Sequence, residues 1–186
     1  MGNTVGNKFF WTTAEDFYCL GLWLADGCWR SSSIGLTSVD RKLIKRFATF
    51  LRRIAPESTL KERIYPVKRG ERRRQVGIQI YINNRSLTRL FLSQKNGRLV
   101  IPSRYLLAYL AGRIDGDGSI DRKYRSGIRI AYGSREDAER DQRLFGKTNV
   151  SLYRYRAART YVLYLRKKYR DAIMDELRRY SNKLVP

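Results

Sequence analysis

Two Asp-Gly pairs stand at equivalent places in the chain, and their aspartates could do chemistry together. Asp26 lies near the end of the segment Cys19–Gly27, CLGLWLADG, and Asp117 near the end of Leu110–Gly118, LAGRIDGDG. Aligned on these pairs, the segments lie 91 residues apart, close to half of the 186-residue chain. Carboxylate oxygens are ligands that hard divalent cations prefer. Two aspartates brought together would bind such a cation and support metal-assisted cleavage of a phosphodiester.

Small residues precede each pair at helical spacing. The stripe consists of Gly21 and Ala25 in the first segment and of Ala108, Gly112 and Gly116 in the second. Such stripes let two helix backbones approach closely, so we expect the helices to cross at Gly21, Ala108 and Gly112. Their C-terminal ends, which carry negative dipole charge, then place Asp26 beside Asp117 in a field that attracts cations.

The alternative to a metal site is a purely structural role for each pair, because an Asp-Gly can simply end a helix and begin a hairpin. The glycines Gly27 and Gly118 suit the left-handed conformation that commonly follows a helix. Two copies at half-chain spacing, each behind a stripe of small residues, favour the metal site over this alternative.

Composition narrows the possible classes of protein. The chain has 39 Lys and Arg against 17 Asp and Glu, a net charge of +22, with no His and only two Cys. Ser-His-Asp and Cys-His hydrolases and Cys/His zinc modules are therefore excluded. We expect Cys19 and Cys28 to be small buried thiols in a reducing compartment.

The basic charge points to nucleic acid as the partner, since phosphate contacts supply affinity. An anionic membrane surface is the alternative, but the charge is scattered and not confined to one amphipathic helix. No apolar run approaches the ~20 residues that span a bilayer, and Met1–Thr4 shows no signal peptide. We therefore expect a cytoplasmic, nucleoid-associated protein without a membrane partner.

The elements that must position the aspartates repeat in the two halves. The patterning predicts an α+β fold with two halves, 8–97 and 98–186, each ordered helix, two strands, helix, two strands, helix. In the first half we expect helices at 13–25, 41–54 and 85–93 and strands within 28–38, 59–66 and 75–82. In the second half we expect helices at 102–116, 134–145 and 168–180 and strands near 118–123, 127–133, 149–156 and 159–166.

The polar side chains that alternate with apolar ones along the strands are expected to face nucleic acid. Arg and Gln can read base edges, whereas Lys and loop Arg more often hold phosphate. Ile64 should lie on the opposite face of its strand, away from the nucleic acid. The predicted contacts are Arg30, Lys61, Arg63, Arg72, Arg73, Arg74, Gln75, Gln79, Tyr81, Arg122, Arg125, Arg129, Tyr153, Arg154, Tyr155, Arg156, Arg159 and Tyr161.

The two segments resemble the signature of the LAGLIDADG homing endonucleases. Leu110–Gly118 matches it at seven of nine positions and differs at Arg113 and Gly116, whereas Cys19–Gly27 matches more loosely. The compact chain with two motifs is similar to small monomeric members encoded in archaeal introns. The resemblance implies a pseudo-symmetric αββαββα pair whose two antiparallel sheets form a saddle over duplex DNA.

The resemblance also implies the activity. It implies Mg²⁺-dependent double-strand cleavage of a long, non-palindromic DNA site across the minor groove, leaving short 3′ overhangs. Mn²⁺ is expected to substitute for Mg²⁺, and Ca²⁺ to support binding without cleavage. Asp26 and Asp117 take the catalytic, metal-binding positions, and the main-chain carbonyls of Ala25 and Gly116 are candidate further ligands.

The chain departs from the family pattern at two places. The earlier acidic position is Asp115 in the second motif but Leu24 in the first, and we expect Asp115 to cap or hydrogen-bond locally. A basic or amide side chain near the attacking water stays unassigned, with Arg129 and Gln79 as candidates that are better explained as DNA contacts.

Two other functions compete with the endonuclease. One is an intron-RNA splicing factor, or maturase, on the same scaffold, which would not need both aspartates. The other is a nuclease of the Asp…Glu-x-Lys type, for which the chain offers only Asp40-Arg41-Lys42 and Asp121-Arg122-Lys123, neither after a suitable apolar strand.

Overall fold

The computed structural model describes residues 11–69, 73–98, 100–121 and 127–184. The first half contains α1 (Ala14–Asp26), β1 (Gly27–Trp29), β2 (Ser33–Ser38), α2 (Arg41–Ile54), β3 (Lys61–Arg69), β4 (Arg73–Asn83) and α3 (Arg85–Ser93). The second half contains α4 (Leu106–Asp117), β5 (Gly118–Asp121), β6 (Gly127–Tyr132), α5 (Arg135–Phe145), β7 (Val150–Tyr155), β8 (Thr160–Leu165) and α6 (Lys167–Tyr180). The short turns Gln94–Arg98 and Ser103–Tyr105 lead from α3 into α4. The expected α+β element order is confirmed.

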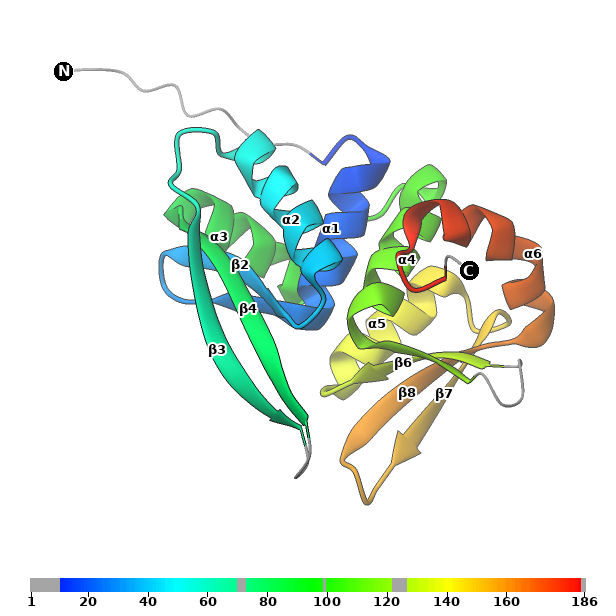
Figure 1. The fold of residues 1–186 in the computed structure, drawn as a ribbon. Helices are drawn as coiled ribbons and strands as arrows, with labels where there is room; N and C mark the ends of the chain where they lie inside the picture. The colour runs from blue at the N-terminus through cyan, green and yellow to red at the C-terminus, as the bar shows by residue number, and fades with distance from the viewer. Residues whose placement is uncertain (1–10, 70–72, 99, 122–126, 185–186) are drawn as a thin grey trace.

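Each half contributes one four-stranded antiparallel sheet. The strand orders are β1-β2-β4-β3 and β5-β6-β8-β7. The register places Thr37 and Arg63 on either side of Gln79, and Ser119 and Tyr164 on either side of Arg129. Helices cover one face of each sheet, and α1 and α4 lie together between the two sheets (Figure 1).

The hydrophobic core lies between the helices and the sheets. On β4 the side chains of Ile78, Ile80 and Ile82 are at most 5% exposed, as the period of two requires. Ile64, by contrast, is 64% exposed and Val76 is 49% exposed. Ile64 pairs with Ile78 and so lies on the predicted face, opposite Arg63, but it is exposed because the β3–β4 hairpin extends beyond the helix layer (Figure 1).

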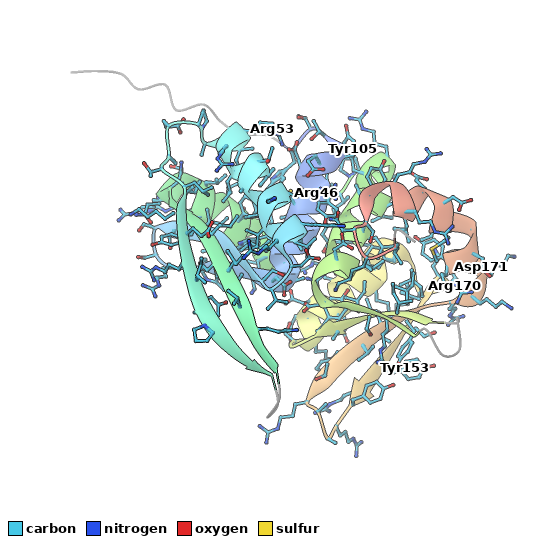
Figure 2. All side chains as sticks on the ribbon, in the orientation of Figure 1. Arg46, Arg53, Tyr105, Tyr153, Arg170 and Asp171 are labelled. Atoms are coloured by element: carbon cyan, nitrogen blue, oxygen red, sulfur yellow. The ribbon has the colours of Figure 1, made fainter. Side chains whose placement is uncertain are left out.

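The first helix begins with a capping box. The Thr13 hydroxyl accepts from the backbone N–H of Asp16, and the Asp16 carboxylate accepts from the backbone N–H of Thr13 at 2.8 Å. Asp16 also pairs with Arg53 at the end of α2 (Figure 2). This side chain therefore ties the start of the motif helix to the helix that covers the first sheet.

The glycines after the motif helices have a different role from the one expected. Gly27 has φ −67° and Gly118 has φ −79°, so both are extended and neither is left-handed. A Cβ at Gly27 would overlap the carbonyl oxygen of Trp23, and one at Gly118 would overlap that of Ile114. Glycine is needed here because the chain leaves each helix against its own last turn.

Both cysteines are free thiols. Cys19 is fully buried, Cys28 is half-buried, and neither forms a disulfide. Within the described parts of the chain, no helix has both the length and the apolar character to cross a membrane.

Candidate active site at the end of the crossed helices

Helices α1 and α4 cross in backbone contact. A Cβ at Gly21 would overlap the carbonyl oxygen of Tyr109 and lie 3.1 Å from the backbone nitrogen of Arg113. A Cβ at Gly112 would overlap the carbonyl oxygen of Tyr18. Ala108, further back on the same stripe of α4, is 1% exposed. Glycine at these two positions is what permits the close approach.

The crossing brings the two motif ends together. A Cβ at Gly116 would overlap the Cβ of Ala25 and lie 3.5 Å from Oδ2 of Asp26. Burial, and then the nearby charge of Asp117, raise the pKa of Asp26 from 3.8 to about 6. Burial also raises the pKa of Asp117, while Arg113 and Lys183 act to lower it. The two carboxylates therefore share one electrostatic environment.

Arg113 explains one departure from the signature. This side chain is 2% exposed and donates from Nε to Oδ2 of Asp141 at 3.0 Å. Asp141 also accepts from the hydroxyls of Tyr109 and Tyr132 at 2.8 and 2.9 Å. The arginine is thus part of a buried network behind Asp117. Tyr109 and Trp23 are core residues, as expected.

Asp115 does not bond locally as expected. It is 1% exposed and accepts from the Tyr18 hydroxyl on α1 at 2.7 Å. It also accepts from the Ser181 hydroxyl at 2.5 Å and from the backbone N–H groups of Asn182 and Lys183. These partners lie far away in the sequence, so Asp115 anchors the chain that follows α6.

Lys183 is a site residue that sequence reasoning missed. Its Nζ donates to the carbonyl oxygens of Ile114, Gly116 and Gly118, at 3.2, 2.9 and 3.0 Å. Burial lowers the pKa of its ammonium, and Asp115, Asp26 and Asp117 oppose that shift. Nothing in the pattern marks this lysine beyond the last helix; the only hint was an Asp115 without a counterpart at Leu24.

Two cavities open beside the aspartates, one on each side of the crossing. The first, of about 470 Å³, is lined by Asp26, Gly116, Lys183 and Gln75 among others. The second, of about 390 Å³, is lined by Asp117, Arg129 and residues of β8 and its turn. Gln75 and Arg129 therefore come close to the aspartates, and the Nε of Arg129 donates to the Ser119 hydroxyl at 2.7 Å.

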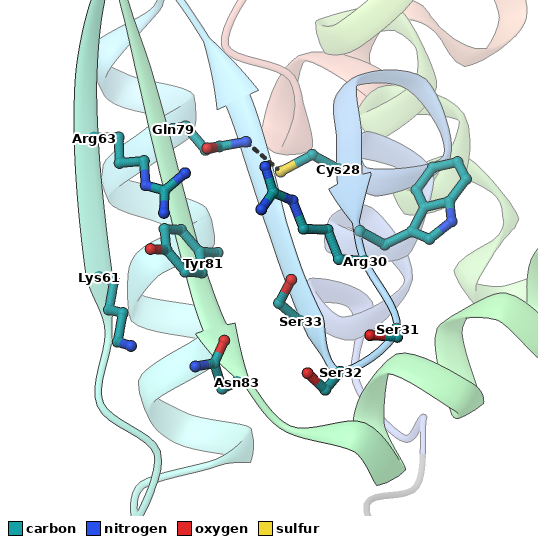
Figure 3. A pocket seen from close by; sticks show the side chains of 11 residues that line it. Cys28, Arg30, Ser31, Ser32, Ser33, Lys61, Arg63, Gln79, Tyr81 and Asn83 are labelled. Atoms are coloured by element: carbon teal, nitrogen blue, oxygen red, sulfur yellow. Dashed lines mark hydrogen bonds between the residues drawn. The ribbon is translucent and has the colours of Figure 1, made fainter.

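The first sheet gathers polar side chains on the face away from its helices. A groove of about 300 Å³ there is lined by Arg30, Lys61, Arg63, Gln79 and Tyr81, with the serines of the β1–β2 turn (Figure 3). Gln79 donates to Cys28 at 3.2 Å and lies within 3.4 Å of the Thr37 hydroxyl, and the Arg63 guanidinium lies 5.1 Å from the Tyr81 ring centre. The structure thus brings these five predicted residues to one surface.

The predicted residues of the second sheet divide between its two faces. Arg129, Tyr153 (labelled in Figure 2) and Tyr155 share the face of Tyr164. The Tyr153 and Tyr164 rings lie 5.5 Å apart, and the Tyr155 and Tyr164 hydroxyls lie 2.6 Å apart. Arg154 and Tyr161 instead line a hollow with Arg135 and Glu139 of α5.

The expectation that Arg154 and Tyr161 join the same face as Arg129 is therefore wrong, because the period of two turns them to the helix side. Arg156 and Arg159 lie exposed at the β7–β8 turn. Five predictions concern side chains outside those described: Arg72, Arg73, Arg74, Arg122 and Arg125.

The oxygen atoms at the crossing fit a hard cation. The candidate ligands are the carboxylates of Asp26 and Asp117 and the carbonyl of Ala25, while the Gly116 carbonyl is bonded to Lys183. Among the residues that the structure describes, no group of three or more Cys, Asp and Glu side chains could hold a metal. Asp40, of the competing Asp…Glu-x-Lys reading, caps α2 by accepting from the Lys42 backbone at 2.8 Å.

Residues 18–95 match the profile of the LAGLIDADG-like domain. The match lies in the first half of the chain and includes the first motif segment. No curated protein sequence matches it. Its fold is that of the homing endonuclease I-DmoI: a structure of mesophilic I-DmoI variants aligns with a TM-score of 0.64 and 19% identity over 88% of this chain and 90% of that one.

Other structures with the LAGLIDADG fold align comparably. I-DmoI in complex with DNA and Mn has a TM-score of 0.63 and 17% identity, covering 88% of this chain and 96% of that one. The N-terminal LAGLIDADG domain of DUF199/WhiA has a TM-score of 0.59 and 15% identity, covering 91% of this chain and 82% of that one. At these identities the likeness establishes the fold.

Proposed function

We propose that the chain is a site-specific homing endonuclease that cuts both strands of duplex DNA with a divalent metal. The observation that carries the proposal is the pairing of Asp26 with Asp117 at the ends of two helices in backbone contact, between two sheets with polar open faces. The charge of Asp117 raises the pKa of Asp26, and a cation placed between the two carboxylates would relieve this repulsion. The proposed metal is Mg²⁺, for which Mn²⁺ would substitute.

The similar structures support the choice of partner and metal. I-DmoI structures contain target DNA together with Mg, Mn or Ca. By analogy, this chain would act as a monomer on a long, non-palindromic site and leave short 3′ overhangs across the minor groove. Its halves, 8–97 and 98–186, would each contact one side of the cut, as members encoded in introns do.

The residues of this chain divide the work. Asp26 and Asp117, with the Ala25 carbonyl, would hold the cation, whose Lewis acidity activates water and stabilises charge on the leaving oxygen when it is bound. Arg129, which lines the cavity of Asp117, would neutralise phosphate there. The rigid crossing of α1 and α4 fixes the distance between the two carboxylates before DNA arrives.

Substitution of the aspartates tests the proposal. Asp26→Asn and Asp117→Asn should each reduce double-strand cleavage by about 10³-fold while DNA binding in Ca²⁺ persists. The assay uses the intronless allele of the host gene as substrate, with Mg²⁺ or with a chelator. Asp40→Asn is the matched control, because Asp40 lines the same cavity as Asp26 and Asn caps a helix equally well. Cleavage by both aspartate variants at the normal rate would refute the assignment.

The alternative function, binding of intron RNA as a maturase, is favoured by the exposed rings of Tyr153 and Tyr155 beside Arg129. Unpaired RNA bases stack on such rings. Splicing assays of the intron with the Asp26→Asn variant separate the two roles. Splicing that survives in a cleavage-dead variant would show that both functions coexist.

A further inference from the structure

The chain after α6 turns back onto the motif helix α4. We call residues Ser181–Leu184 the C-terminal segment. Ser181 is 2% exposed and Leu184 is 9% exposed, so the segment is docked against the protein. Asp115 holds it with both carboxylate oxygens, which accept from the Ser181 hydroxyl and from the backbone N–H groups of Asn182 and Lys183, at 2.5, 2.7 and 3.1 Å.

Docking places the Lys183 ammonium on the last turn of α4. An ammonium has three donors, and Nζ lies within 3.2 Å of three carbonyl oxygens, those of Ile114, Gly116 and Gly118. The carbonyl oxygens in the last turn of a helix carry negative dipole charge, so they attract a cation. Lys183 therefore occupies a carbonyl that the family resemblance assigns to the metal.

The first motif has no equivalent of this arrangement. Leu24 stands where the second motif has Asp115, and an offset of 91 residues pairs Lys183 with Leu92. Neither leucine can anchor a segment or supply a charge. The two motif helices thus end differently: among the described residues a lysine caps the last carbonyls of α4, and neither Leu24 nor Leu92 supplies an equivalent for α1.

We propose that Lys183 is a positioning residue, a tethered cation that takes the place of a divalent ion at the Gly116 carbonyl, in the cavity that Gly116 and Asp26 line together. The inference rests on the proposed function. Lys183 blocks the Gly116 carbonyl as a ligand, and its charge repels a second cation nearby. Asp115, in turn, serves to dock the lysine and is not itself a metal ligand.

The direct test counts metal ions. Mn²⁺ is titrated into the full chain and the unbound ion is followed by electron paramagnetic resonance, which needs no DNA target. Lys183→Met should tighten binding about tenfold and add a second bound ion. The control is Lys42→Met, which also removes one positive charge. Lys42 is exposed and follows Asp40 by two residues, and Asp40 lines the cavity of Asp26 and Lys183. This control should change the Mn²⁺ affinity less than twofold.

Equal behaviour of Lys183→Met and Lys42→Met would overturn the inference, since charge alone would then explain the result. Failure of the proposed function looks different: the unaltered chain would bind no Mn²⁺, or Asp26→Asn and Asp117→Asn would bind it as the unaltered chain does. The thermal midpoint of each variant, followed by circular dichroism, confirms that the fold is retained.

For a second variant, Asp115→Asn, the proposal and simple electrostatics predict opposite changes in Mn²⁺ affinity. Asp115→Asn removes a negative charge near the centre, which by itself weakens cation binding. The proposal predicts tighter Mn²⁺ binding instead, because the C-terminal segment loses its anchor and carries Lys183 away. The double variant Asp115→Asn/Lys183→Met should bind no tighter than Lys183→Met alone. Weaker binding by a folded Asp115→Asn variant would contradict the proposal.

Discussion

Arg129 and Arg154 carry the same side chain in the same sheet, yet they point to opposite faces. Arg129 lines the cavity of Asp117 with Tyr155 and Tyr164, whereas Arg154 lies beside Glu139 of α5. One residue of register decides which of them meets nucleic acid.

The two arginines therefore give a matched pair of variants. Arg129→Ala should weaken DNA binding in Ca²⁺ by about tenfold, since a charged contact to DNA is worth ~1–3 kcal/mol. Arg154→Ala should change it less than twofold, because Arg154 lies on the helix side of the sheet, beside Arg135 and Glu139 of α5. Fluorescence anisotropy with a labelled duplex measures both. An equal loss for the two variants would show that the faces are assigned wrongly.

The Asp16 carboxylate makes the stability of the fold depend on pH. Its side chain is fully buried, which alone would raise its pKa, but bonds from Thr12, Arg53 and Thr13 outweigh burial and hold the pKa below 3.8. A lowered pKa stabilises the fold above the pKa of the unfolded chain, and this contribution disappears as the pH falls through the folded value.

Asp16→Asn should accordingly lower the free energy of unfolding by ~2 kcal/mol at pH 7. The gap between variant and unaltered chain should stay constant down to about pH 5 and shrink as the pH falls below 3.8. Urea unfolding followed by circular dichroism across this range measures it. A gap that persists unchanged at pH 2.5 would disagree with the pKa shift.

At the scale of elements, the helix crossing depends on two glycines that leave no room for a methyl group. Gly112→Ala should destabilise the protein by about 1–3 kcal/mol, because the new Cβ would overlap the Tyr18 carbonyl and lie 2.7 Å from the Leu22 nitrogen. Gly133→Ala is the control, since nothing lies within 4 Å of its Cβ, and it should stay within ~0.5 kcal/mol. Chemical denaturation measures both. Equal stability of the two variants would show that the crossing tolerates a side chain.

The elements themselves were largely predictable, because the signals for them are local. The predicted helices at 41–54 and 85–93 have the observed bounds, since Asp40 and Asn84 cap them and apolar residues recur at helical spacing. The exposure of Ile64 and the docking of Lys183 were not predictable, because each depends on how far one element extends over another. An alternating pattern shows that two faces differ but not which parts of a face another element covers.

For the whole molecule, the net charge of +22 includes basic side chains on the open face of the first sheet and others exposed on α2 behind it. Each phosphate neutralised lowers the slope of log K against log salt by about 0.9. The double variant Lys61→Met/Arg63→Met should therefore reduce the magnitude of that slope by ~2.

Its control is Lys45→Met/Arg52→Met, which removes the same residue types from exposed positions on α2, behind the first sheet. The control should leave the slope unchanged. Equal slopes for the two double variants would mean that net charge, and not the sheet face, governs the affinity.

The β3–β4 hairpin, which extends beyond the helix layer, affects the expected lengths of the two half-sites of the DNA target. Strands of 9 and 11 residues reach roughly 30–36 Å at about 3.3 Å per residue. The 6-residue strands β7 and β8 reach only about 20 Å. At about 3.4 Å per base pair, these lengths correspond to about nine to eleven base pairs against about six. The half-sites should therefore be unequal, and a hydroxyl-radical footprint should extend about three to five base pairs further from the cut on the side read by the first half. Footprint arms of equal length would argue against this prediction.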